Sequence, residues 1–220
     1  MIQADTSAPT NRIAAGSIQS LKSTGCREQK NVIRNECLML KEVHSVKLID
    51  KYLPSWDYGK VNKILLNYKS VPNISIIYHA DFGKSKIIRT LFFLRGLPAK
   101  MLKIDDFIET GFILLEENNK EIVIGLVAQP WKATGNIMKM SPVDFNGFDK
   151  PDYVKVAWNF LIEEIDEEEI RISTETRIHC TSGIARKYFS VYWFFISYFS
   201  SVIRNEMLKI IGKEISKVNV

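Results

Sequence analysis

Histidine and cysteine, the residues most often used for metal binding and nucleophilic catalysis, are few and scattered in this chain. Three of each occur in 220 residues, and no two have the spacing of a zinc-binding pair. His179 and Cys180 are adjacent, but neighbours on a strand point to opposite faces, which argues against a catalytic pair. No glycine-rich phosphate loop is present. The sequence therefore predicts no catalytic residue, no metal and no cofactor, and the cysteine pattern favours a reducing, cytoplasmic setting.

A group of polar residues near the C-terminus could act on a ligand. Glu175 and Asn159, paired across two strands beside Arg177, could orient a ligand or supply a general base. The alternative, which we favour, is a solvated sheet face with ion pairs between neighbouring strands. The acidic run 163–169 could bind a cation, but it lacks the pattern of a calcium loop and is expected to be a solvated turn.

The remaining candidate site is apolar. Eight of the 24 aromatic residues lie between Tyr188 and Phe199, and a helix there would face two strands that carry aromatic rings and threonines. Ligand pockets are built this way, and so are ordinary cores, so both interpretations stay open. The predicted ligand-binding residues are Trp158, Phe160, Thr174, Thr176, Tyr188, Tyr192, Phe195 and Phe199.

Two alternating strands, Tyr153–Glu163 and Ile170–His179, must position the first four of these residues. Their alternating apolar or small residues have even numbers: Val154, Val156, Trp158, Phe160 and Ile162 in the first strand, and Ile170, Ile172, Thr174, Thr176 and Ile178 in the second. Directly opposed residues share a face. A turn centred on Glu167 satisfies this rule and sets Trp158 against Thr176 and Asn159 against Glu175. The odd-numbered residues would then form a charged outer surface: Lys155, Asn159, Glu163, Arg171, Glu175, Arg177 and His179.

A long helix starting near Ser182 must position the other four. At 100° per residue its apolar stripe comprises Ile184, Tyr188, Val191, Phe195, Phe199 and Val202, and a bend or break is expected near Ser200–Ser201, where the stripe shifts. The uncharged stretch Tyr188–Ile203 has sixteen residues, whereas a membrane span needs about 20. A buried core helix is therefore favoured over an interfacial helix or a span.

The rest of the chain divides into a polar, flexible extension, residues 1–47, and a single domain, residues 48–220. A strand is expected at Tyr58–Lys69, helices at Ile74–His79, Ser85–Leu94 and Ile104–Thr110, and a hairpin at Gly111–Glu117 and Glu121–Ala128. The segment Trp131–Phe148 is undecided between strand and loop. Of the net charge of +5, residues 1–60 contribute +3, so the remaining body is nearly neutral and gives little support for nucleic-acid binding.

Several sequence blocks together resemble the SRPBCC superfamily, also called START-like or helix-grip proteins, and more narrowly a group of uncharacterised bacterial members. The blocks are Leu53-Pro-Ser-Trp-Asp-Tyr, Leu91-Phe-Phe-Leu-Arg-Gly-Leu-Pro, Gly125-Leu-Val, Lys155-Val-Ala-Trp-Asn-Phe, Ile172-Ser-Thr-Glu-Thr-Arg, Tyr192-Trp and Ile203-Arg-Asn-Glu-Met-Leu. The resemblance implies an α+β helix-grip fold: a curved antiparallel sheet, short helices after the first strand, and a long C-terminal helix that closes a hydrophobic tunnel.

The first functional hypothesis is a non-enzymatic protein that binds a hydrophobic small molecule or a lipid between the sheet and the C-terminal helix. The alternatives are a cyclase-like or hydrolase-like enzyme on the same scaffold, which requires a titratable residue in the cavity, or a membrane-surface protein that uses the C-terminal helix. A non-enzymatic role is favoured because the even-numbered strand positions supply no titratable group. Peripheral contact with a membrane is a further expected interaction.

Overall fold

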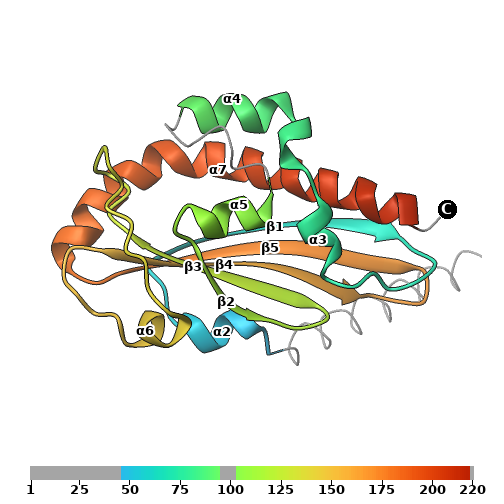
Figure 1. Ribbon diagram of the computed structural model, residues 1–220, viewed down its shortest axis with the longest axis horizontal. Coiled ribbons are helices and arrows are strands. Elements are labelled where there is room, and N and C mark those ends of the chain that lie inside the picture. The colour runs from blue at the N-terminus through green and yellow to red at the C-terminus, as the bar shows by residue number, and fades with distance from the viewer. Residues whose placement is uncertain (1–45, 95–102, 219–220) are drawn as a thin grey trace, which may run out of the picture. The chain divides into compact units, whose positions relative to one another are not determined.

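The computed structural model describes residues 46–94 and 103–218, and the structural statements below refer to these ranges. Along the chain it contains (Figure 1) α2 (Leu48–Tyr52), β1 (Tyr58–Asn67), α3 (Ile76–His79), a 3-10 turn (Phe82–Lys84), α4 (Lys86–Leu94), α5 (Ile104–Glu109), β2 (Ile113–Glu117), β3 (Glu121–Ala128), α6 (Pro142–Gly147), β4 (Val154–Glu164), β5 (Glu169–Cys180) and α7 (Gly183–Val218). The strands and helices expected from the sequence are confirmed within a few residues. The expected extension 1–47 lies almost entirely outside the described ranges.

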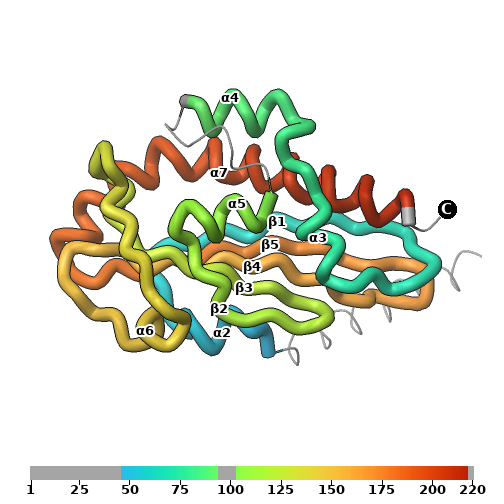
Figure 2. Tube along the Cα trace, in the orientation of Figure 1, coloured from blue at the N-terminus to red at the C-terminus, as the bar shows by residue number. Residues whose placement is uncertain are grey.

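The five strands form one antiparallel sheet in the order β1-β5-β4-β3-β2. The predicted register of the last hairpin is confirmed, because Trp158 pairs with Thr176 and Asn159 pairs with Glu175. The long helix α7 crosses one face of this sheet, as the trace in Figure 2 shows. The chain thus has the α+β helix-grip fold that its sequence blocks imply.

The face beneath α7 carries the even-numbered residues of β1, β3, β4 and β5, and it holds the main core. Trp158, Phe160 and Ile172 pack there against residues from α3, α4, α5 and α7. Gly212 allows α7 to approach β1 closely, because an added Cβ atom would lie 3.1 Å from the Leu66 side chain. Burial of this apolar face provides the main driving force for holding α7 on the sheet.

The opposite face is not the solvated surface that its charged residues predict, and that expectation is wrong. Two short helices, α2 and α6, cover its centre (Figure 1), and Val123, Val127 and Ala157 pack against them in a second apolar cluster. Among the odd-numbered polar residues, Asn159 is only 1% exposed and Arg177 only 4%. The sequence does not reveal this cover, because the α2 segment is short and its contacts with the sheet are distant in sequence.

Helix α7 runs without interruption from Gly183 to Val218, so of the expected bend or break near Ser200–Ser201 the break does not occur, although the helix is curved (Figure 1). Its orientation also differs from the prediction, because the stripe that contains Tyr188, Phe195 and Phe199 faces away from the sheet. The buried stripe instead comprises Ala185, Phe189, Ser200, Ile203, Met207 and Ile211. The first half of the helix is apolar on both sides, so periodicity alone selects the wrong face.

The undecided segment 131–148 contains turns, an isolated bridge between Met138 and Val127, and helix α6. The Ser141 side chain begins α6 by accepting a hydrogen bond from the Asp144 amide, and Pro142 follows at the first helical position. This segment therefore contributes Phe145 to the second apolar cluster.

Candidate functional site

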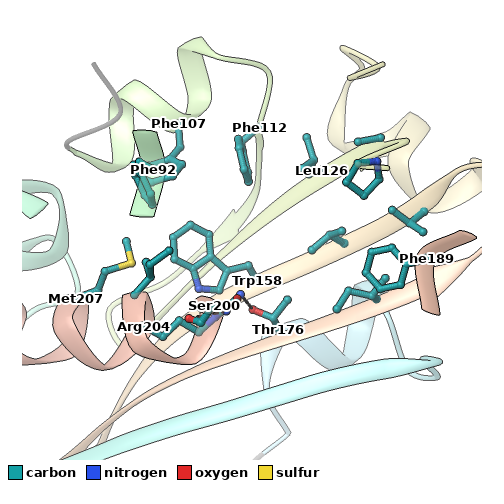
Figure 3. Close-up of a pocket in the computed structure, with 16 residues that line it drawn as sticks. Phe92, Phe107, Phe112, Leu126, Trp158, Thr176, Phe189, Ser200, Arg204 and Met207 are labelled. Carbon is teal, nitrogen blue, oxygen red and sulfur yellow. Dashed lines mark hydrogen bonds between the residues drawn. The ribbon is translucent and has the colours of Figure 1, made fainter. Parts of the chain in front are cut away.

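A partly open cavity of about 130 Å³ lies between α7 and the even-numbered face of the sheet. Figure 3 shows its lining, which comes from α4, α5, the sheet, the segment after β3, and α7. The lining residues are Phe92, Phe107, Phe112, Leu126, Ala128, Pro130, Val154, Val156, Trp158, Thr176, Ile178, Phe189, Ser200, Ile203, Arg204 and Met207.

Side-chain size along α7 explains why space remains at this point. The inward stripe carries Phe189 on one side of the cavity and Ile203 and Met207 on the other, but Ser200 between them is small. Beneath α7, a small apolar cluster that contains Val154, Ile178 and Phe189 lies beside the main core. This cluster reaches the cavity through Phe189, and the main core reaches it through Trp158. The cavity is therefore the gap where these two clusters meet.

Aromatic rings on the α5 side form one wall. Phe107 contacts Trp158 with ring centroids 5.6 Å apart, and it contacts Phe92 and Phe112 at 5.9 and 5.4 Å, all three in edge-to-face geometry. Thr174 fixes the indole of Trp158, because its hydroxyl oxygen accepts a 2.7 Å hydrogen bond from the Trp158 Nε1–H. The wall is apolar and its rings hold one another in place.

The polar side of the cavity is formed by Arg204. Its guanidinium donates to the Thr176 hydroxyl and to the Ser200 backbone carbonyl, the latter at 3.2 Å, and lies 6.0 Å from the centroid of the Trp158 ring. Figure 3 shows these groups together at the floor of the cavity, next to the indole. Among the described lining residues Arg204 is the only ionisable one. It places a permanent positive charge beside an apolar space.

The predicted site residues fall into three groups. Trp158 and Thr176 line the cavity, and Phe160 and Thr174 support Trp158 from the core. Tyr192 is half-buried and packs against Phe189, outside the lining. The expectation that Tyr188, Phe195 and Phe199 face the sheet is wrong, because all three are exposed on the outer side of α7. Ligand binding by Trp158 and Thr176 stays a prediction.

Sequence reasoning misses several lining residues, above all Arg204 and Ser200. The sequence analysis takes the aromatic stripe as the inner face of α7. That choice places Arg204 on the side away from the sheet and Ser200 at the expected bend or break. The spacing of Phe189, Ser200, Ile203 and Met207 continues to Ile211 without a shift, and this unbroken stripe is the signal that could have found the inner face.

The polar group of Asn159, Glu175 and Arg177 lies on the far side of the sheet from the cavity. Arg177 donates to Glu175 at 2.6 Å and to the Leu53 carbonyl at 2.9 Å, and it pairs with Asp50 at 2.7 Å. Burial by itself raises the pKa of Glu175, but hydrogen bonds from Lys47 and Arg177 outweigh it, so that the pKa is lowered. These residues attach α2 to the sheet.

Glu121 completes this attachment at the other end of α2. Its carboxylate accepts hydrogen bonds from the Leu48 and Ile49 amides, at 2.6 and 3.3 Å, and from the Asn159 side chain at 2.6 Å. Free amides at the start of a helix are a favourable site for a carboxylate. Burial nevertheless raises the pKa of Glu121. The buried polar layer therefore has a structural role in positioning α2.

Cys180 and His179 do not form a catalytic pair. The Cys180 thiol is buried, and its burial, with the nearby Asp57 carboxylate, raises its pKa to about 12. His179 is partly exposed, and its Nδ1 atom lies 3.7 Å from the Asp57 carboxylate, which also pairs with Arg186. Within residues 46–94 and 103–218, no cluster of His, Cys, Asp or Glu could hold a metal ion.

No family model matches the chain, and no curated protein matches it. Solved structures match it weakly. A hypothetical protein from Helicobacter pylori is 12% identical with a TM-score of 0.31, covering 80% of this chain and 97% of that chain. A Thermus thermophilus protein is 9% identical with a TM-score of 0.30, covering 73% and 100%. The Zhui aromatase/cyclase from Streptomyces is 10% identical with a TM-score of 0.23, covering 73% and 96%. At these TM-scores the matches carry no argument, and the fold assignment rests on the topology of this chain.

Proposed function

We propose that this protein binds a small hydrophobic molecule in the cavity beneath α7, as a non-enzymatic member of the uncharacterised bacterial SRPBCC group that its sequence resembles. The observation that carries the proposal is a largely apolar cavity, walled by packed aromatic rings, with one cationic side chain at its floor. Apolar lining with a few placed polar groups is the usual composition of a small-molecule site.

The size of the cavity limits the ligand. A dry cavity of about 150 Å³ in another protein accepts benzene, whereas sites for drug-sized ligands measure about 300–1,000 Å³. The present cavity, at about 130 Å³, suits a single ring or a short acyl chain. A sterol or a full-length lipid tail would require displacement of α7 or of the aromatic wall.

Arg204 indicates the chemistry of the polar end of the ligand. A guanidinium binds carboxylates through paired N–H donors, and such hydrogen bonds are stronger than those between neutral groups. A short hydrophobic acid would place its chain against Trp158 and Phe107 and its carboxylate on Arg204. We therefore propose a small hydrophobic acid as the ligand class.

Titration calorimetry with hexanoate, 1-hexanol and hexylamine tests this proposal. Hexanoate is expected to bind most tightly and hexylamine least tightly. Arg204→Met should weaken hexanoate binding by about 10- to 100-fold, the equivalent of a charged hydrogen bond, and should leave hexanol binding nearly unchanged. Equal affinity for hexanoate and hexanol in the unaltered protein would refute the acid preference.

A second variant pair tests the location of the site. Val156 lines the cavity, so Val156→Phe should fill it and abolish binding of both hexanoate and hexanol. Val61→Phe is the matched control, because Val61 is exposed on the opposite face of β1 and should leave binding intact. Binding that survives Val156→Phe would place the ligand elsewhere.

The enzyme hypothesis gains little from this geometry. It requires an acid or base in the cavity, and Arg204 stays protonated at all physiological pH values, so it can stabilise charge but cannot shuttle a proton. A Glu175 side chain in the cavity could have served as that base, but Glu175 lies under α2 on the other face of the sheet.

A further inference from the structure

The outer side of the N-terminal half of α7 is an extended apolar surface. Seven large apolar side chains on this side are between 44% and 78% exposed. They recur at helical spacing and therefore lie along one stripe. We call this stripe the outer aromatic face; it consists of Ile184, Tyr188, Val191, Phe194, Phe195, Tyr198 and Phe199. An apolar surface of this extent on a soluble protein marks a contact site.

Positive charges border the outer aromatic face. No Asp or Glu occurs from Gly183 to Asn205, and none occurs in α4. Lys187 is exposed within the stripe, and α4, which packs against α7 (Figure 1), exposes Lys86, Arg89 and Phe93. The surface thus combines aromatic rings with cations and lacks carboxylates in these two helical segments.

One end of the face carries a tryptophan. Trp131 stacks on Tyr188 with ring centroids 6.1 Å apart, and the neighbouring Lys132 is exposed. Tryptophan and tyrosine favour the boundary between lipid headgroups and acyl chains, because each ring has an apolar body and a polar group. Basic residues beside them are attracted to anionic headgroups.

Within the described residues no helix is long and apolar enough to cross a bilayer. An amphipathic helix with aromatic and basic residues can instead lie in the plane of the interface. A second copy of the chain fits this face less well, because a symmetric contact would bring Lys187 and the α4 cations against one another. The charge pattern therefore selects an anionic lipid surface.

We infer that the outer aromatic face docks this protein onto an anionic membrane, with α7 parallel to the bilayer plane. Phe194, Phe195 and Tyr198 enter the headgroup boundary, and Lys86, Arg89 and Lys187 contact the lipid phosphates. The cavity lies on the inner side of α7, so docking leaves its lining in place. This inference stands on surface residues and does not depend on the proposed ligand.

Co-sedimentation of the full chain with vesicles tests the inference. Binding is expected to vesicles of phosphatidylcholine and phosphatidylglycerol at 3:1, and it should weaken on raising the salt concentration and be much weaker with phosphatidylcholine alone. Phe194→Asp should reduce binding at least tenfold, and Lys86→Glu combined with Arg89→Glu should do the same. Val143→Asp is the matched control, because Val143 is similarly exposed but lies on α6, beyond the opposite face of the sheet.

Two outcomes would overturn the inference: no binding to the anionic vesicles, or equal binding by the Phe194→Asp and unaltered proteins. The competing explanation is that the face binds a second copy of the chain, and sedimentation equilibrium without vesicles tests it. If the unaltered protein is a dimer and Phe194→Asp is a monomer, the face is a contact between copies. Hexanoate binding should also be measured in Phe194→Asp. A variant that loses vesicle binding but still binds hexanoate would show that the membrane surface and the cavity are separate sites.

Discussion

At the scale of single residues, the structure assigns opposite roles to polar groups on the two sides of one sheet. Arg204 lies at the wall of an apolar space, where its guanidinium donates to Thr176 and Ser200 and borders the cavity. Glu175 on the other side is held by two cations, Lys47 at 2.8 Å and Arg177 at 2.6 Å. The first arrangement suits ligand binding, whereas the second stabilises α2.

The Glu175 ion pairs predict a pH-dependent stability. The folded-state pKa of Glu175 lies below its ordinary value of 4.5, so its stabilising contribution is complete above that value and is lost as the pH falls through the lowered pKa. Glu175→Gln should lower the free energy of unfolding by about 3 kcal/mol at pH 7, because it leaves buried Arg177 without this partner. The difference should shrink below pH 4.5 in denaturant titrations.

Glu164→Gln provides the control for that experiment. Glu164 pairs with Lys120 at the exposed end of the same hairpin, so its loss should cost less than about 0.5 kcal/mol at either pH. A Glu175→Gln protein as stable as Glu164→Gln at pH 7 would contradict the structural role of the buried layer.

The environment of Cys180 predicts an unreactive thiol. With its pKa raised to about 12 by burial and by Asp57, almost no thiolate exists at pH 8. Iodoacetamide should therefore label Cys180 slowly in the native protein and rapidly in denaturant, as followed by mass spectrometry of the Cys180 peptide. Rapid native labelling would show that the thiol is accessible and activated.

At the scale of elements, α7 shows what the sequence could and could not determine. The even-numbered pattern of β4 and β5 predicts their register correctly, because each strand carries apolar residues at alternate positions. The inner face of α7 could not be chosen in the same way, since Tyr188 and Phe189, or Phe195 and Ile196, are apolar neighbours on different sides. Contacts of α7 with β1, β5, α3 and α4 decide the orientation, and these contacts are not local in sequence.

The same limit applies to the odd-numbered sheet face. The pattern of charged residues predicts a solvated face, but the short helix α2 covers it. With five residues, α2 is too short to give a clear helical periodicity in the sequence. The candidate site is therefore only half predictable. The strand residues Trp158 and Thr176 line the cavity as expected, but Arg204, the ionisable residue of the described lining, does not follow from the pattern.

Alanine substitutions on α7 test its orientation directly. Phe189 is 2% exposed, so Phe189→Ala should lower the free energy of unfolding by about 3–5 kcal/mol. Phe195→Ala removes an identical ring from the outer aromatic face and should change stability by less than about 0.5 kcal/mol. Denaturant unfolding of both variants gives the comparison, and a reversed order would place the wrong face of α7 on the sheet.

At the scale of the whole molecule, the described residues form three layers: one sheet and a layer of helices on each of its faces. Helix α7 and the helices beside it cover the even face, α2 and α6 cover the odd face, and β4 and β5 are buried between them (Figure 2). The cavity lies between the sheet and α7, and the structural polar network lies between the sheet and α2. The cavity and the network that anchors α2 therefore lie on opposite faces of the sheet.

Hydrogen exchange should report this layering. The amides of Asn159 and Glu175 lie at the centre of the two covered strands and should exchange only by near-global unfolding. Amides of β1, whose Val61 and Leu65 side chains are exposed at the sheet edge, should exchange faster. Equal rates at the two places would indicate that the odd face is open to solvent.

The most direct test of ligand binding beneath α7 is the nuclear magnetic resonance signal of the Trp158 indole N–H during titration with hexanoate. This group donates to Thr174 and its ring lines the cavity, whereas Trp56 stacks on Arg177 across the sheet. If hexanoate binds beneath α7, the Trp158 signal should shift saturably in the unaltered protein but not in Val156→Phe, and the Trp56 signal should stay unchanged. A Trp158 signal that stays constant at saturating hexanoate, or a shift confined to Trp56, would contradict it.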